Sequence, residues 1–139
     1  MAIRRFEDLD AWRLSFELQR DVFAFTAYGA AWEDLKFRDQ IRDAAASAPR
    51  NIAEGFGRYR PREFARFLHI ARGSLHETRH HLHDALQRSY LTAGEHDRLI
   101  HLSDRALGAS TALLRYLNRC GAHGPTRRLT SARKVTSDR

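Results

Sequence analysis

Hydrophobic positions recur every three or four residues along most of this chain, which is the spacing of one face of an α-helix. They fall into four runs separated by turn-forming residues, and none of the runs alternates as a strand would. The runs cover about 7–28, 32–57, 60–89 and 92–120. Helices of this length joined by short connections predict an all-α fold, namely an antiparallel up-down-up-down four-helix bundle.

Local signals support these boundaries. Acidic Glu33 and Asp34 stand where the second run begins, and Pro61 occupies a first-turn position of the third. Thr92 and Glu95 form a Thr-x-x-Glu capping box at the start of the fourth. The third and fourth runs each carry one apolar stripe that predicts the core: Phe64, Leu68, Ala71, Leu75, Thr78, Leu82 and Ala85, and Leu99, Ala106, Ser110, Leu113 and Leu117.

The first run differs because it has two apolar sides. At 100° per residue, Leu14, Leu18, Val22 and Phe25 lie roughly opposite Leu9, Trp12, Phe16 and Phe23. The core of one bundle cannot cover both sides, and a large exposed apolar stripe usually marks an interface. The pattern predicts a homo-oligomer. It leaves open which side is core, and we assign the interface to Leu9, Trp12, Phe16 and Phe23.

Two positions inside the predicted helices are unusual. Pro49 removes a backbone hydrogen bond and predicts a kink, with polar neighbours that can satisfy freed backbone groups or bond to another helix: Ser47, Asn51 and Glu54. Helix propensity does not explain Gly73-Ser74 inside the third run. Close approach of another helix is the expected reason.

Composition predicts where in the cell the protein lies and divides the chain into two segments. The 139 residues carry a formal net charge of +7 and one cysteine, with no apolar run long enough to cross a membrane and no signal-like start. A cytoplasmic protein without membrane attachment is expected. We predict a bundle over residues 1–120 and a separate basic tail over residues 121–139, which is rich in Gly, Ser, Thr and Arg.

The densest positive stretch runs from Arg50 to Arg72 and includes the aromatic residues Phe56 and Tyr59. Guanidinium groups pair with phosphates, and aromatic rings stack on bases. A solvated basic turn without a ligand is the alternative. The candidate contacts to RNA or DNA are Arg50, Arg58, Arg60, Arg62, Arg66, Arg72, Arg127 and Arg128.

One stretch matches a catalytic motif. His76-Glu77-Thr78-Arg79-His80 fits H-E-x-x-H, in which two histidines bind zinc and the glutamate acts as a general base. The extended form of the motif would need Gly and His where His83 and Leu86 stand, and Glu95, the only later glutamate, reads as a helix cap. We therefore predict no metal site, no catalytic residues and no cofactor.

Several segments resemble the family of 23S rRNA intervening-sequence proteins: 6–12, 40–42, 47–55 and 64–77. The resemblance implies a four-helix bundle assembled as a homopentameric ring, without enzymatic activity. A related group comprises accessory proteins of diversity-generating retroelements, which bind a reverse transcriptase and nucleic acid. The resemblance also places Glu77 in a family G-S-x-x-E pattern, which makes the H-E-x-x-H match coincidental.

Three hypotheses of function follow. The first is a non-enzymatic oligomeric scaffold that binds nucleic acid through sequence-independent phosphate contacts, or assists a partner such as a reverse transcriptase. The second is an oligomeric protein-interaction module that binds no nucleic acid. The third is a metal-dependent hydrolase that uses the H-E-x-x-H segment.

Overall fold

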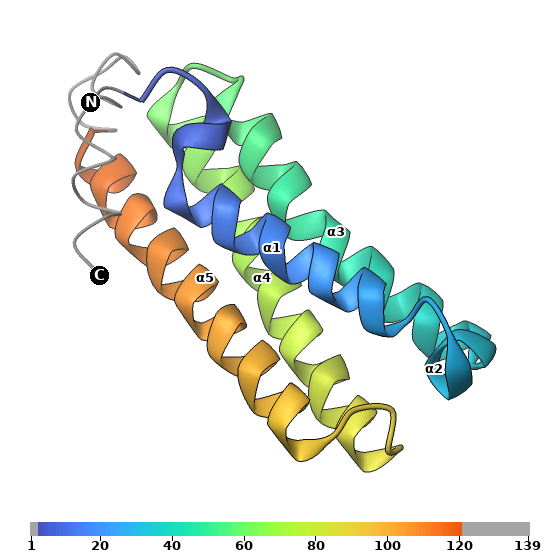
Figure 1. Ribbon diagram of the computed structural model, residues 1–139. Coiled ribbons are helices and arrows are strands. Elements are labelled where there is room, and N and C mark those ends of the chain that lie inside the picture. Colours follow the sequence, from blue (N-terminus) through green and yellow to red (C-terminus); the bar gives the residue numbers. More distant parts are fainter. Residues whose placement is uncertain (1–2, 121–139) are drawn as a thin grey trace.

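The computed structural model describes residues 3–120, and every regular element in that range is helical. A single 3-10 turn precedes five α-helices: 3-10 helix Phe6–Asp8, α1 Asp10–Phe25, α2 Gly29–Glu33, α3 Leu35–Phe56, α4 Pro61–Gln87 and α5 Ala93–Cys120. The four long helices lie side by side, with α1 and α4 each packed against both α3 and α5 (Figure 1). Over the described residues, no helix combines the length and apolarity needed to traverse a bilayer.

The first predicted helix is interrupted, which corrects the expected span of 7–28. The carboxylate of Asp8 accepts hydrogen bonds from the backbone N–H groups of Arg4 and Arg5, at 3.0 and 3.2 Å. This holds a separate turn before α1. At the other end, the Thr26 hydroxyl donates to the Val22 carbonyl at 2.7 Å. The chain then enters the short helix α2, which the apolar pattern did not predict.

The starts of the other long helices are confirmed. Asp34 caps α3 by accepting from the Phe37 N–H at 3.3 Å, and Pro61 is the first residue of α4. At α5 the Glu95 N–H donates to the Thr92 hydroxyl at 3.1 Å, and the Thr92 N–H donates to the Glu95 carboxylate at 2.9 Å. The Thr92 N–H, and after it the Thr92 side chain, lower the pKa of Glu95 because they favour the charged form of its carboxylate.

The core contains every residue of the predicted stripes in α4 and α5. In α1 the pattern had left the core side open, and Leu18 and Val22 are fully buried. Leu9 is fully buried as well, since the turn before α1 points it into the cluster around Phe64. The assignment of Leu9 to an interface between chains is therefore wrong, because it has no surface to offer a partner.

The polar residues near Pro49 connect α3 to α4. The hydroxyls of Ser47 and Ser74 lie 2.7 Å apart, and the Asn51 amide donates to the Ser47 carbonyl at 2.8 Å. Gly73, beside Ser74, is exposed, and a Cβ added there would meet nothing within 4 Å. The predicted close approach of another helix at Gly73-Ser74 therefore occurs at Ser74, which is buried against α3, and does not occur at Gly73 within the described chain.

A polar cluster joins the start of α3 to the connection between α4 and α5. The Tyr90 hydroxyl donates to the Asp34 carboxylate at 2.7 Å, and Arg88 donates to Asp34 at 3.1 Å and to Asp84 at 3.0 Å. The Tyr90 bond, the Phe37 N–H and the charge of Arg88 together lower the pKa of Asp34. The charged form of Asp34 is thus favoured by folding.

This cluster predicts a loss of stability in acid. A carboxyl whose pKa is lowered by folding contributes stability above its unfolded pKa, about 4, and loses it as the pH falls through the folded value. We expect the thermal midpoint to fall between about pH 5 and pH 3, with Glu95 contributing in the same direction. Tyr90→Phe should lower the midpoint at pH 7 and make the acid-induced fall shallower, as measured by circular dichroism. An equally steep fall in the variant would contradict a role for Asp34.

Candidate nucleic-acid interface

The connection between α3 and α4 is a short turn that covers residues 57–60. The Gly57 N–H donates to the Ala53 carbonyl at 3.2 Å, which closes α3. Arg60 is extended, at φ −114° and ψ 126°, as the residue before a proline prefers, and Pro61 then begins α4. The two helices meet closely beneath the turn, because a Cβ at Gly55 would lie 2.8 Å from atoms of both Phe64 and Phe67. The helix ends beneath the turn are therefore tightly packed.

Four arginines surround this turn, and we call Arg58, Arg60, Arg62 and Arg66 the basic turn. Arg58 pairs with Glu54 at 3.0 Å and approaches Glu63 at 4.0 Å. The guanidinium groups of Arg58 and Arg66 lie 5.0 and 5.2 Å from the centre of the Phe67 ring. Carboxylates thus partly neutralise Arg58, while Arg66 rests on an aromatic surface.

Arg60 and Arg62 differ from Arg58 because no carboxylate within residues 3–120 pairs with them. Both are exposed, and neither side chain forms an ion pair or a hydrogen bond with another residue of the range 3–120. Arg60 also lacks a side-chain cap bond at the start of α4. An exposed guanidinium without a partner can bind phosphate without first breaking a bond in the protein.

The structure separates the remaining candidates from the basic turn. Arg50 precedes Arg58 by eight residues, a rise of about 12 Å along a helix, and lines a groove between α3 and α1. Arg72 follows Arg62 by ten residues, about 15 Å along α4. Arg72 is half-buried, and its Nε is buried without a hydrogen-bond partner among the described residues. Arg127 and Arg128 lie outside the described residues.

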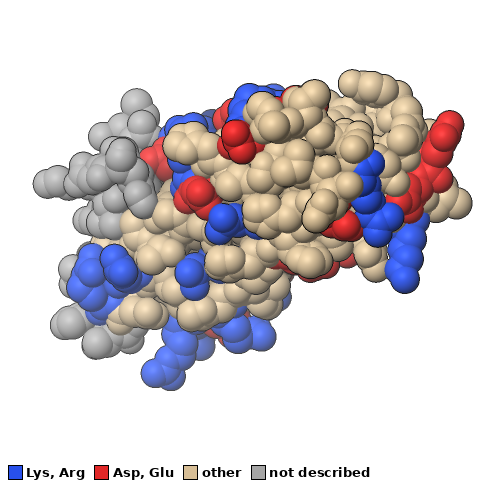
Figure 2. Space-filling view, turned by 90° about the horizontal axis from the view of Figure 1, so that it is seen from below, with Lys and Arg blue, Asp and Glu red and all other residues tan. Residues whose placement is uncertain are grey.

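Further positive residues lie on segments that share one end of the molecule with the basic turn. The N-terminal segment, the α3–α4 turn and the last turn of α5 share one end of the molecule (Figure 1), where Ile3, Phe64 and Leu117 belong to one apolar cluster. This adds Arg4, Arg5, Arg115 and Arg119, which sequence analysis did not select because only folding brings them together. Figure 2 shows Lys and Arg side chains with few acidic neighbours at the end beside the chain termini.

The comparisons with known proteins agree with this helical architecture. A model of the 23S rRNA-intervening sequence protein family matches residues 7–109, about three quarters of the chain. The chain belongs to this family. The match includes the basic turn and the H-E-x-x-H segment but not the tail. No curated protein gives a significant match.

In this family member, the H-E-x-x-H segment lies on the outer surface of α4. His76, Glu77 and His80 are exposed, and Glu77 approaches His81 at 3.5 Å. Within residues 3–120, no group of three His, Cys, Asp or Glu side chains is placed to hold a metal ion. The geometry of the described part therefore supplies no zinc centre to the motif.

A prediction about metal follows from this geometry. Protein purified without a metal-affinity step should lack stoichiometric zinc by elemental analysis, and a chelator should leave its thermal midpoint unchanged. One tightly bound zinc per chain, together with hydrolytic activity that Glu77→Gln abolishes, would contradict the prediction.

A histidine pair that was not predicted from the sequence lies between α4 and α5. The Nδ1 of His83 lies 2.9 Å from the Nε2 of His96, which is buried. Burial lowers the pKa of His83, and the charges of His96, Arg79 and His80 lower it further. This pair is separate from the basic turn, and its neutral form favours the contact between the helices.

Two of the aromatic residues assigned to an interface, Trp12 and Phe16, line a groove of about 330 Å³ between α1 and α3. Trp12 and Phe16 stack with their ring centres 4.8 Å apart, and Phe6 meets Trp12 edge-on. Arg50, Pro49 and Gln19 also line the groove. Phe23 is half-buried nearby, with the guanidinium of Arg42 at 4.0 Å from its ring centre. The chain covers these rings only in part.

Proposed function

We propose that this protein is a non-enzymatic, cytoplasmic scaffold that binds nucleic acid through phosphate contacts made by the basic turn. Arg60 and Arg62 carry the proposal: their side chains are exposed and unpaired among the described residues, and they lie at the end of the turn and in the first turn of α4, above closely packed helices. Contacts of this kind depend on charge and do not read base sequence. The reverse transcriptase implied by the family resemblance is a proposed partner of the same scaffold.

We also propose that the chain forms an antiparallel up-down-up-down bundle and self-associates, as a homopentamer by resemblance. Trp12 and Phe16 support this proposal, because they line an open groove and are only half-buried, and Phe23 on the same helix is half-buried as well. Repeating a chain of net charge +7 around a closed assembly would place several basic turns on one particle. Weak phosphate contacts would then act together through effective concentration.

The test is a double substitution, Arg60→Ala with Arg62→Ala. Each lost phosphate contact should reduce the slope of log affinity against log salt by about one, and we expect roughly tenfold weaker binding at about 50 mM salt. Duplex and single-stranded probes should be affected alike. Fluorescence anisotropy with labelled DNA and RNA of random sequence measures both quantities.

A matched control removes the same charge elsewhere. Lys36 in the first turn of α3 and Arg98 in the second turn of α5 are exposed and lie away from the basic turn, and Arg98 pairs with Asp21 at 2.9 Å. Lys36→Ala with Arg98→Ala should leave the salt slope nearly unchanged. Deleting residues 121–139 tests Arg127 and Arg128 separately.

Failure of the intact protein to bind any probe at about 50 mM salt would favour the protein-interaction module.

A further inference from the structure

Tyr59 stands at the centre of the basic turn in a backbone conformation that its side chain does not favour. Its φ is 63°, in the left-handed region that glycine and asparagine occupy more readily. Its neighbours Arg58 and Arg60 are exposed as well. A bulky residue in this conformation indicates that the position serves something besides local backbone geometry.

The ring of Tyr59 is exposed and forms no hydrogen bond or ring contact that would stabilise the described part of the fold. Its residue surface is 74% exposed, and within the described chain it forms no hydrogen bond or ring contact. By contrast, Phe56 packs edge-on against Phe64, and Phe67 lies against the guanidinium groups of Arg58 and Arg66. Tyr59 is therefore the exposed aromatic residue of this turn, and its ring contacts no aromatic ring or guanidinium group within the described chain.

An exposed aromatic ring between arginines has the chemistry of a stacking platform for an unpaired base. Arg60 and Arg62 can hold the phosphates on either side while a base lies on the ring. In a duplex, each base is already stacked between its neighbours, so the ring gains nothing there without disrupting the helix. The same turn would then bind both forms through phosphates but favour the single strand through stacking.

We propose that Tyr59 gives the basic turn a preference for single-stranded nucleic acid by stacking on an unpaired base. This inference rests on the proposed function, because the phosphate contacts must hold the strand in place. It adds a preference for strandedness without a preference for sequence, since every base offers a stacking face.

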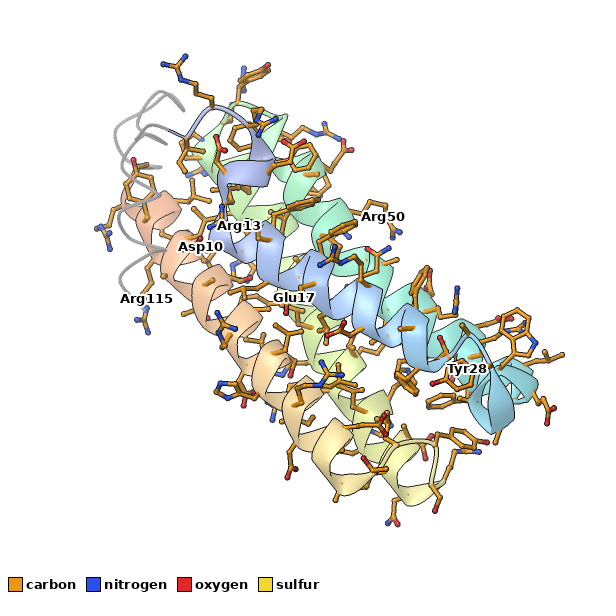
Figure 3. All side chains as sticks on the ribbon, viewed as in Figure 1. Asp10, Arg13, Glu17, Tyr28, Arg50 and Arg115 are labelled. Atoms are coloured by element: carbon orange, nitrogen blue, oxygen red, sulfur yellow. The ribbon has the colours of Figure 1, made fainter. Side chains whose placement is uncertain are left out.

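The test compares a 20-nucleotide deoxythymidine single strand with a 20-base-pair duplex by fluorescence anisotropy at about 50 mM salt. Tyr59→Ala should weaken single-strand binding about tenfold and change duplex binding less than twofold. Tyr59→Trp should retain the preference. Tyr28→Ala is the matched control, because Tyr28 is 72% exposed and lies at the other end of the bundle (Figure 3). It should change neither affinity.

Tyr59→Gly separates binding from folding. Glycine adopts a φ of 63° without strain, so the thermal midpoint should stay the same or rise while single-strand binding falls as in Tyr59→Ala. If the protein binds both probes but Tyr59→Ala weakens both equally, or neither, the stacking inference is wrong while the phosphate contacts stand. If the wild-type protein binds neither probe, both proposals are wrong.

Discussion

Replacing Gly55 with alanine is expected to lower the free energy of unfolding by about 1–3 kcal/mol. The new Cβ would lie 2.8 Å from Phe64 Cδ1 and 2.8 Å from Phe67 Cβ. The ring of Phe64 is fully buried, and the Cβ of Phe67 is fixed to the α4 backbone, so neither atom can move aside cheaply. The two helices would have to separate beneath the basic turn. Urea unfolding monitored by circular dichroism measures the change.

Two other glycines provide matched controls. A Cβ at Gly57 would meet the Glu54 carbonyl oxygen at 3.5 Å, an ordinary contact, so Gly57→Ala should have a small effect. At Gly73 the added methyl would meet nothing within 4 Å, and alanine should stabilise the helix interior by about 0.5–1 kcal/mol. Equal effects at Gly55 and Gly73 would contradict the close packing of α3 on α4. Destabilisation at Gly73 would indicate that another chain covers this surface.

The sequence predicted the helix boundaries that depend on neighbours within three or four residues. Asp34, Pro61 and the Thr92–Glu95 box act at this range, and each begins a helix as expected. The stripes of α4 and α5 were predictable for a related reason. Each of these helices buries a single face, so a period of 3.6 residues identifies the side that packs.

The first helix was harder to predict because its boundaries depend on contacts that periodicity does not record. Apolar spacing continues through Leu9, but the hydrogen bonds of Asp8 to the preceding backbone create a separate turn. At the other end, Arg42 of α3 donates to the Thr26 hydroxyl at 2.8 Å, sixteen residues away in the sequence. Only the folded chain brings these groups together.

The candidate interface was predictable where its residues belong to one turn. Arg58, Arg60 and Arg62 are close in sequence and remain close in space. Arg50 and Arg72 were grouped with them by sequence distance, but the rise of a helix carries each of them at least two turns away. The left-handed conformation of Tyr59 left no signal in the sequence, since a tyrosine in that position gives no reason to expect a positive φ.

Trp12→Glu is expected to dissociate the proposed oligomer into folded monomers. Trp12 lines the groove between α1 and α3 and stacks on Phe16. If another chain covers this groove, a carboxylate at position 12 would be buried without a partner, which is strongly unfavourable. Native mass spectrometry at micromolar concentration should give a multiple of the 16.1 kDa chain for the wild type, five by resemblance, and one chain for the variant. Phe16→Glu should act in the same way.

Trp32→Glu is the matched control for this experiment. Trp32 is 45% exposed in α2, at the end of the bundle opposite the basic turn, and the guanidinium of Arg38 lies 4.1 Å from its ring centre. Its replacement should preserve the wild-type mass, because it removes the same side chain from a surface outside the groove. Helical circular dichroism must persist in all three variants if their effect is on assembly. A wild-type monomer at micromolar concentration would exclude self-association, and dissociation by Trp32→Glu alone would move the interface to the α2 end.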